Sequence, residues 1–159
     1  MTYLSVTRFR LRSGNPVGLA LFFWHTLRSG RQAERSPGFL GGKMLVAAKQ
    51  TYWTLTVWQD EAGMKAYRTT GNHRAALRGM KLLDRFCSEA VTFGRPHTGL
   101  ELPESDSLLD ELNMSGRFFA LSRPSAAHRD RALQSAPIRV AQILKPHVCP
   151  EAAAQRSLS

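Results

Sequence analysis

Among the side chains of this 159-residue chain, His73 is the strongest single candidate for chemistry. It lies in GNHRAALRGM (71–80), where His73, Leu77 and Met80 follow the i, i+4, i+7 spacing of one helix face. An imidazole that titrates near neutral pH can ligate a metal or exchange a proton with a bound phenol or enol. It can equally close the edge of a core, and the spacing leaves both interpretations open.

Aromatic residues precede this histidine in TYWTLTVWQDEAGMKAY (51–67). Alternation along a strand puts Tyr52 and Trp58 on one face and Trp53 on the other. With Tyr67 they could form a wall for a flat or polyene ligand, although packing of a sheet explains the same pattern. The candidates for ligand contact are Trp58, Tyr52, Tyr67, Leu77 and His25.

Motifs of the common enzyme classes are absent from the sequence. It has no nucleophile elbow, phosphate-binding loop, dinucleotide fingerprint or zinc motif, and the glycines of GNPVG and PGFLGG lack the required spacing. Cys87 and Cys149 lie far apart without metal-ligand spacing. These absences argue against hydrolases, kinases, nicotinamide enzymes and zinc enzymes. They favour chemistry in which the substrate or a haem supplies the reactivity.

The net charge of +10 belongs to the first part of the chain. Residues 1–99 hold 15 Lys and Arg against 5 Asp and Glu, whereas residues 100–159 hold 7 of each kind. A basic domain can bind nucleic acid or an anionic small ligand. The basic residues are spread out, however, and no nucleic-acid-binding signature accompanies them. We therefore expect a solvated basic surface and no nucleic-acid partner.

The longest apolar run, VGLALFFW (17–24), is too short to cross a membrane. Three arginines before it give a faint likeness to a signal peptide, but His25 and Arg28 follow at once and no small-x-small cleavage site appears. We therefore expect no membrane span and a cytoplasmic location with reduced thiols.

The elements that must position these residues follow from periodicity and turn signals. Strands are predicted at 3–11, 39–50, 51–59 and 89–96, with a tight turn near Lys49–Gln50. Helices are predicted from Pro16 to about Ala33, from near Asp60, and from about His73 to Cys87 after a weak point at TTGN. The order β-α-β-β-α-β is that of a ferredoxin-like unit, so the fold class is α+β.

Such a sheet leaves one apolar face open, and a second copy of the chain would cover it most simply, which predicts a homodimer. Residues 1–96 form the ferredoxin-like domain in this prediction. Residues 97–146 form a linker and C-terminal extension, with GRFFALSRP (116–124) and IRVAQILKP (138–146) as one or two added strands. Residues 147–159 are predicted to be a disordered tail.

The segments SPGFLGGKML, TYWTLTVWQDEAGMKAY and GNHRAAL resemble the antibiotic biosynthesis monooxygenase superfamily of dimeric α+β barrels. The stretch TLTVWQDEAGMKAYRTTGNHRAALR is most similar to the spheroidene monooxygenase type of carotenoid-oxidising protein. The resemblance covers residues 3–96. That superfamily includes cofactor-independent quinone-forming monooxygenases, haem-degrading enzymes, haem dehydratases and proteins with no shown activity, so it implies a fold more firmly than a reaction.

Two departures narrow what the resemblance implies. Spheroidene monooxygenases look like two such units in tandem, whereas this chain has one unit and a shorter remainder. Haem-degrading members carry a helix tryptophan and, ten residues later, a proximal histidine. Aligned through Trp58, these positions fall on Tyr67 and Leu77, so that histidine is absent. His73 lies one turn earlier on the same stripe and could reach the same cavity.

Together these features predict a monooxygenase-like oxidoreductase of secondary metabolism that acts on an apolar or aromatic small metabolite in a pocket between sheet and helices. His73 would be the catalytic residue, and no cofactor would be required. One alternative is a haem-dependent enzyme with His73 or His25 as axial ligand. Another is a non-catalytic small-molecule-binding or interaction protein whose basic surface serves an anionic partner.

Overall fold

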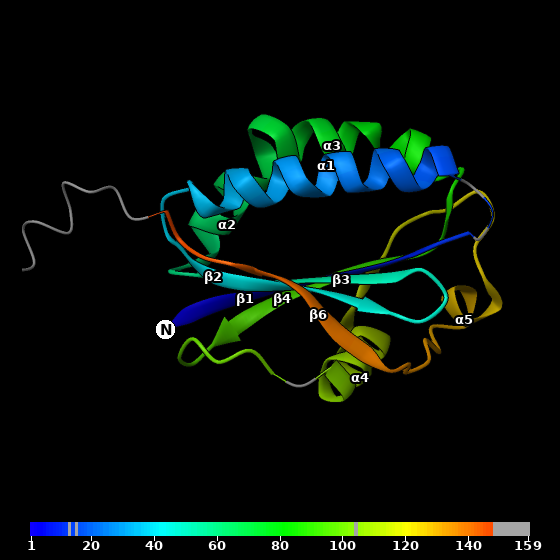
Figure 1. Cartoon of the computed structure of the whole chain (residues 1–159). Coiled ribbons are helices and arrows are strands. Elements are labelled where there is room, and N and C mark those ends of the chain that lie inside the picture. The colour runs from blue at the N-terminus through cyan, green and yellow to red at the C-terminus, as the bar shows by residue number, and fades with distance from the viewer. Residues whose placement is uncertain (13, 15, 104, 148–159) are drawn as a thin grey trace, which may run out of the picture.

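A computed structural model of the chain describes residues 1–12, 14, 16–103 and 105–147, and in these six strands form one antiparallel sheet (Figure 1). The strand order is β5-β4-β1-β3-β2-β6. The strands are β1 (Thr2–Leu11), β2 (Phe39–Ala47), β3 (Thr51–Trp58), β4 (Cys87–His97), β5 (Arg117–Phe118) and β6 (Ile138–Leu144). The helices are α1 (Pro16–Glu34), α2 (Glu61–Thr69), α3 (Gly71–Leu83), α4 (Ser105–Ser115) and α5 (Ala126–Arg129).

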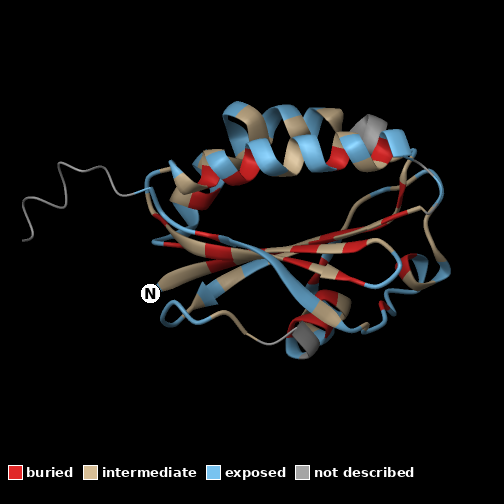
Figure 2. Cartoon of the chain, viewed as in Figure 1, coloured by how far each residue is buried: buried red, intermediate tan, exposed pale blue. Residues whose placement is uncertain are grey.

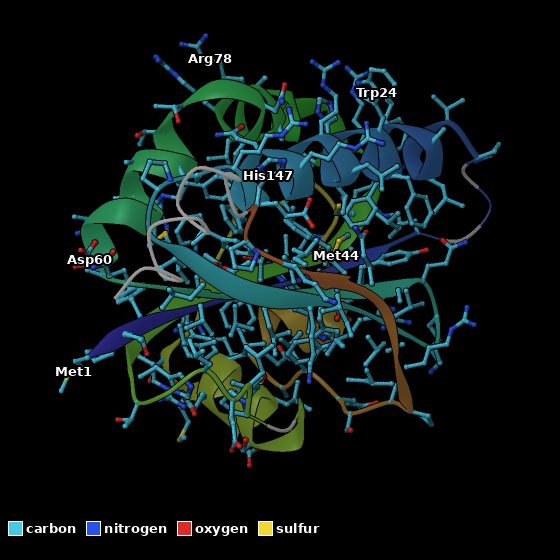
Figure 3. The ribbon with its side chains drawn as sticks, turned by 60° about the vertical axis from the view of Figure 1, so that its left-hand side comes forward. Met1, Trp24, Met44, Asp60, Arg78 and His147 are labelled. Carbon is cyan, nitrogen blue, oxygen red and sulfur yellow. The ribbon has the colours of Figure 1, made fainter. Side chains whose placement is uncertain are left out.

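The four central strands, in the order β4-β1-β3-β2, confirm the ferredoxin-like α+β prediction. Helices α1, α2 and α3 lie over one face of the sheet, and α4 and α5 lie on the other (Figure 1). Figure 3 shows Trp24 and Arg78 on the outer side of the helical layer, pointing away from the sheet. The extension adds β5 at one edge of the sheet and β6 at the other.

Local chemistry explains where the central elements begin and end. Lys49 and Gln50 have φ of 57° and 55°, which gives the tight turn between β2 and β3 the twist that a hairpin needs. Asp60 caps α2 by accepting a hydrogen bond from the Gly63 N–H at 2.7 Å. Thr70 is the one residue between α2 and α3, because the backbone becomes extended there and turns at Gly71, whose φ is +50°.

Three expectations about single elements are corrected. The helix predicted to reach Cys87 ends at Leu83, and Cys87 is instead the first residue of β4, where it is paired with Leu11. The region 97–146, predicted as a linker and extension with one or two added strands, also contains the helix α4, which was not expected. The predicted strand 116–124 contains only two strand residues. Residues 148–159, predicted to be a disordered tail, lie outside the described residues.

Helix α4 forms because apolar residues recur at helical spacing within an acidic segment. Leu108, Leu109 and Leu112 lie on its inner face and are at most 7% exposed. They pack against the sheet face that carries Trp53, Leu55 and Val57 of β3, which are buried. In Figure 2 the buried residues gather on the central strands and on the sides of the helices that face them. The members of this core are Leu4, Val6, Leu45, Trp53, Leu55, Val57, Val91, Leu108, Leu109, Leu112 and Leu133.

This core corrects the prediction about the open face of the sheet. The surface on which we expected a second copy is covered by the chain's own extension, because α4 and Leu133 supply the apolar side chains that the face requires. A homodimer remains a prediction, and it would have to use another surface.

A buried charge cluster also fixes the extension to the sheet. Glu89, which is 1% exposed, accepts hydrogen bonds from Arg8 and Arg10 on β1, and the Arg10 contact measures 2.9 Å. The Ser125 hydroxyl, which caps α5, donates to the same carboxylate at 3.0 Å. Burial alone would raise the pKa of Glu89, but the two guanidinium groups outweigh it and the pKa lies below its ordinary value. Glu89 is therefore ionised at neutral pH.

Candidate functional site

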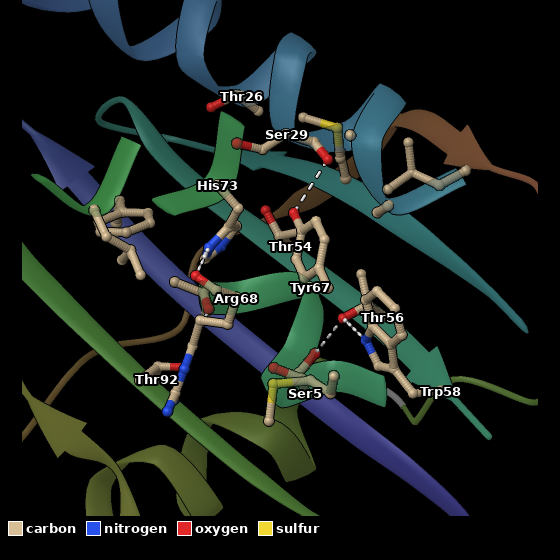
Figure 4. A pocket seen from close by; sticks show the side chains of 18 of the residues that line it. Ser5, Thr26, Ser29, Thr54, Thr56, Trp58, Tyr67, Arg68, His73 and Thr92 are labelled. Atoms are coloured by element: carbon tan, nitrogen blue, oxygen red, sulfur yellow. Dashed lines mark hydrogen bonds between the residues drawn. The ribbon is translucent and has the colours of Figure 1, made fainter. Parts of the chain in front are cut away.

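A cavity of about 350 Å³ lies between the helices α1, α2 and α3 and the sheet (Figure 4). This volume is at the lower end of the range for small-molecule sites. Its floor is a set of hydroxyl side chains from β1, β3 and β4, because alternate residues of each strand face the same side. These are Ser5, Thr7, Thr54, Thr56 and Thr92.

Some hydroxyl groups of the floor form hydrogen bonds with other groups of the sheet. Thr7 is paired with Thr54 on one side and with Thr92 on the other, so the three threonines form a row across the strands. The Thr92 hydroxyl donates to the carbonyl of Val6 at 2.8 Å, and its oxygen lies 3.1 Å from the Thr7 hydroxyl. Because each hydroxyl has one proton, Thr7 is the donor in the second bond.

Trp58 forms the end of the cavity beside α2. Its side chain is fully buried, and its indole N–H donates to the Thr56 hydroxyl at 3.0 Å. The Trp58 ring packs against Tyr67 with centroids 4.9 Å apart, and against Phe39 at 5.2 Å. An aromatic pair of this kind offers a flat apolar wall to a ligand.

Tyr67 and His73 lie side by side on the helical wall, with ring centroids 4.5 Å apart (Figure 4). The Tyr67 hydroxyl donates to the carbonyl of Ser29 at 3.1 Å. His73 Nδ1 lies 3.3 Å from the carbonyl oxygen of Arg68. A carbonyl can only accept, so Nδ1 carries the proton and Nε2 keeps a free lone pair.

Burial keeps both of these groups neutral. It lowers the pKa of His73, and the nearby positive charge of Arg68 acts in the same direction against the backbone hydrogen bond. Burial also raises the pKa of the Tyr67 phenol. At neutral pH the cavity therefore presents an uncharged imidazole that can accept a proton.

Gln32 on α1 positions this part of the wall. Its amide nitrogen donates to the carbonyls of Tyr67 and Thr70, at 3.2 Å and 3.1 Å. Its amide oxygen accepts from the backbone N–H of His73 at 2.9 Å. A single side chain thus holds the junction of α2 and α3, and a Cβ at Gly71 would lie within 3.0 Å of it.

The structure brings four of the six predicted site residues together at the cavity: His73, Tyr67, Trp58 and Leu77. Tyr52 and His25 do not line it. The Tyr52 ring packs instead against Phe22, with centroids 4.8 Å apart. His25 lies at the contact of α1 and α3, where a Cβ at Gly79 would be 3.4 Å from its Nε2.

Several lining residues were not anticipated. Ser29 lines the cavity from α1, and its buried hydroxyl has no hydrogen-bond partner among the described residues. Arg117, Phe119 and Leu144 come from the extension. Alternation could have pointed to Thr54 and Thr7, but no local signal reveals which residues of the extension reach this wall.

The described residues contain no group of three or more His, Cys, Asp or Glu side chains that could hold a metal ion. Within the same residues, no helix has the length and apolar character needed to cross a membrane.

Comparison with known proteins places the fold. No protein-family model matches the sequence, and no curated protein is significantly similar to it. Among solved structures, a candidate antibiotic biosynthesis monooxygenase from Bacteroides thetaiotaomicron is 16% identical, with 64% of this chain and 96% of that chain covered and a TM-score of 0.50. PA3566 from Pseudomonas aeruginosa is 12% identical, with 62% and 95% covered and a TM-score of 0.50.

The chain has the antibiotic biosynthesis monooxygenase-like fold. SnoaB, a cofactor-independent oxygenase from Streptomyces nogalater, is also similar, at 21% identity over 65% of this chain and 98% of that chain, with a TM-score of 0.47. At these identities the likeness establishes the fold alone, and the assignment rests on the two structures with a TM-score of 0.50. They match almost along their whole length, whereas about a third of this chain lies outside the match.

Proposed function

We propose that the chain is a monooxygenase-type oxidoreductase, and that its cavity binds an apolar or aromatic metabolite with a phenolic or enolic hydroxyl group. In this proposal His73 Nε2 accepts the proton of that hydroxyl. The observation that carries the proposal is the state of His73: half-buried, neutral, with Nδ1–H held by a carbonyl and Nε2 without a partner among the described residues.

The chemistry requires little more from the protein. Loss of the hydroxyl proton makes an aromatic ring electron-rich enough to react with molecular oxygen. One oxygen atom then becomes a quinone oxygen, and the other leaves as water with the two hydrogens removed from the substrate, which also supplies the electrons. The walls formed by Trp58, Tyr67 and Met64 exclude water from the reacting anion. No separate cofactor is needed for this balance.

Oxygen uptake with hydroxylated naphthalene and anthrone compounds tests the proposal. A His73→Gln variant keeps a similar volume and loses the base, so we expect kcat/KM to fall by roughly 10²- to 10⁴-fold. His25→Gln is the matched control, because His25 lies outside the cavity, and it should retain activity. Unchanged turnover in His73→Gln would contradict the role of this residue. Binding without oxygen uptake would instead favour the non-catalytic alternative.

Haem remains the competing cofactor hypothesis, and the residues support it less well. His73 is the one histidine among the described residues that line the cavity, and its free Nε2 suits an axial ligand, which would hold an iron able to supply redox chemistry. The Tyr67 ring, however, lies directly against the imidazole. A Soret band that titrates to one haem per chain and changes in His73→Gln would replace the cofactor-free proposal.

A further inference from the structure

The cavity has charged groups of one sign only. None of the described residues that line it is acidic, whereas Arg68 and Arg117 both line it. Neither guanidinium group forms an ion pair with a described carboxylate, since the arginines that do are Arg8, Arg10 and Arg95. The cavity thus has two cations without a described counter-charge.

The sheet register places Arg117 at the end of the hydroxyl row. Arg117 on β5 is paired with Thr92 on β4, and Thr92 is paired with Thr7 on β1. Residues paired in this way point to the same face, which here is the face of the cavity. The extension therefore supplies a cation to a floor that the ferredoxin-like unit builds.

Arg68 approaches from the opposite wall. It lies on α2 directly after Tyr67, is half-buried, and lines the cavity with its side chain in view in Figure 4. Its positive charge acts to lower the pKa of both His73 and Tyr3, although burial is the larger influence on each. Arg68 is therefore close enough to influence an ionised group bound beside His73.

We propose that the ligand of this cavity is an aromatic acid, whose carboxylate lies between Arg68 and Arg117 while its ring system lies against Trp58 and Tyr67. A guanidinium group matches the two oxygens of a carboxylate in one plane, and such charge-assisted bonds are stronger where water is partly excluded. Arg117 is exposed and Arg68 half-buried, so the acid group lies where the cavity meets solvent. The placing of a ring hydroxyl at His73 rests on the proposed function, but the anion site does not.

Two probes that share one ring system and differ in charge test the inference. 3-Hydroxy-2-naphthoic acid carries the carboxylate, and its methyl ester keeps the ring and the hydroxyl without the charge. Their dissociation constants are measured by isothermal titration calorimetry on the full chain at low salt. We expect the acid to bind roughly 10- to 100-fold more tightly than the ester, and the difference to shrink as salt is added.

Substitutions then show which residues cause the difference in affinity between the acid and the ester. The double variant Arg68→Ala, Arg117→Ala should bind acid and ester equally, with ester affinity unchanged. Arg117→Lys should keep part of the preference for the acid over the ester. Arg74→Ala is the matched control, because Arg74 is an exposed arginine of α3 that does not line the cavity, and it should keep all of it. Melting temperatures show whether each variant is folded.

Equal affinities in the unmodified chain, no detectable binding of either probe at millimolar concentration, or a preference that persists in the double variant would overturn the inference. His73→Gln separates this result from the proposed function. Loss of oxygen uptake in that variant with the acid preference retained supports both proposals. Absent oxygen uptake in every variant, with the preference intact, removes the oxygenase proposal and leaves the anion site standing.

Discussion

On the face of the sheet that carries Leu4 and Leu55, α4 and Leu133 complete a core in which each buried side chain is at most 8% exposed. On the other face, Thr7 and Thr54 border a cavity of about 350 Å³. The same strands build both surfaces, because successive residues point to opposite sides. The helices α1, α2 and α3 cover one face but leave a space that the hydroxyl side chains do not fill.

The comparison shows how one sheet can pack a core on one face and border a cavity on the other. Threonine suits a strand because its Cβ is branched, yet it offers a hydroxyl where valine would offer a methyl group. The Thr92 and Thr56 hydroxyls return to backbone carbonyls of β1, so the polar floor is compatible with a buried position. The packed face supplies stability, and the other face borders the cavity in which we propose that a ligand binds.

The largest expected effect concerns the charge cluster on the packed face. Glu89→Ala leaves Arg8 buried without its carboxylate, so we expect the free energy of unfolding to fall by roughly 3–5 kcal/mol. Glu111→Ala is the control, because the paired side chains of Arg95 and Glu111 are 37% and 30% exposed, and its loss should cost only about 1 kcal/mol. Urea denaturation measures both. Equal losses would show that the Glu89 cluster does not stabilise this face.

A cavity made on the packed face should cost nearly as much. Leu112 is fully buried under the sheet, so Leu112→Ala should lower the free energy of unfolding by roughly 2–5 kcal/mol. Met114→Ala on the same helix changes a side chain that is 75% exposed, and it should be close to neutral. If both variants unfold at the same urea concentration, α4 does not pack as described.

On the hollow face, stability should depend on pH through His73. Its pKa is lowered in the folded chain, so the unfolded chain binds the proton more readily and stability falls as pH drops below about 6.5. The stability that the neutral His73 contributes is fully present above about pH 6.5. His73→Gln should remove this part of the decline, which thermal melts between pH 5 and 7.5 would reveal. An identical pH profile in both proteins would show that His73 is not buried in its neutral form.

The smallest effect is expected at Ser29. Its hydroxyl is buried without a partner among the described residues, so Ser29→Ala should be neutral or stabilising by up to about 1 kcal/mol. Thr92→Ala, which removes a hydroxyl that is bonded to Val6, should instead destabilise the chain. Calorimetric melting compares the two. A clear loss of stability in Ser29→Ala would mean that its hydroxyl is satisfied.

Local pattern predicted the central fold because alternation and turn chemistry decide it. Tyr52 and Trp58 do share a strand face, and Lys49 and Gln50 do form the turn. The helix in the extension was missed because the apolar residues Leu108, Leu109 and Leu112 of α4 lie among acidic residues at 101–111. An amphipathic helix of three turns beside charged residues resembles a polar linker until the surface that it covers is known.

The cavity residues that the sequence pointed to are those that lie close together in the chain. His73 and Leu77 share a helix face, and Tyr67 and Trp58 lie within ten residues of each other, so local spacing led to the cavity. Tyr52 shares the strand face of Trp58 but lies outside the cavity, because α1 places Phe22 over it. Ser29, Gln32 and Arg117 reach the cavity or its wall from elements that are distant in the sequence. The spacing of residues within one segment does not reveal such contacts.

The covering helix α4 follows the central strands in the sequence, and this order has a consequence during synthesis. Residues 1–97 contain the four central strands of the sheet. When only these residues have been translated, the face that carries Trp53 and Leu55 still lacks the helix α4 that covers it. At ribosomal speeds, residues 98–144 follow over roughly 2–10 s. During that interval the nascent chain displays an apolar sheet face to chaperones and to neighbouring polysomal chains. Translation that stalls in this interval should therefore yield insoluble fragments, and the face closes only once α4 has been made.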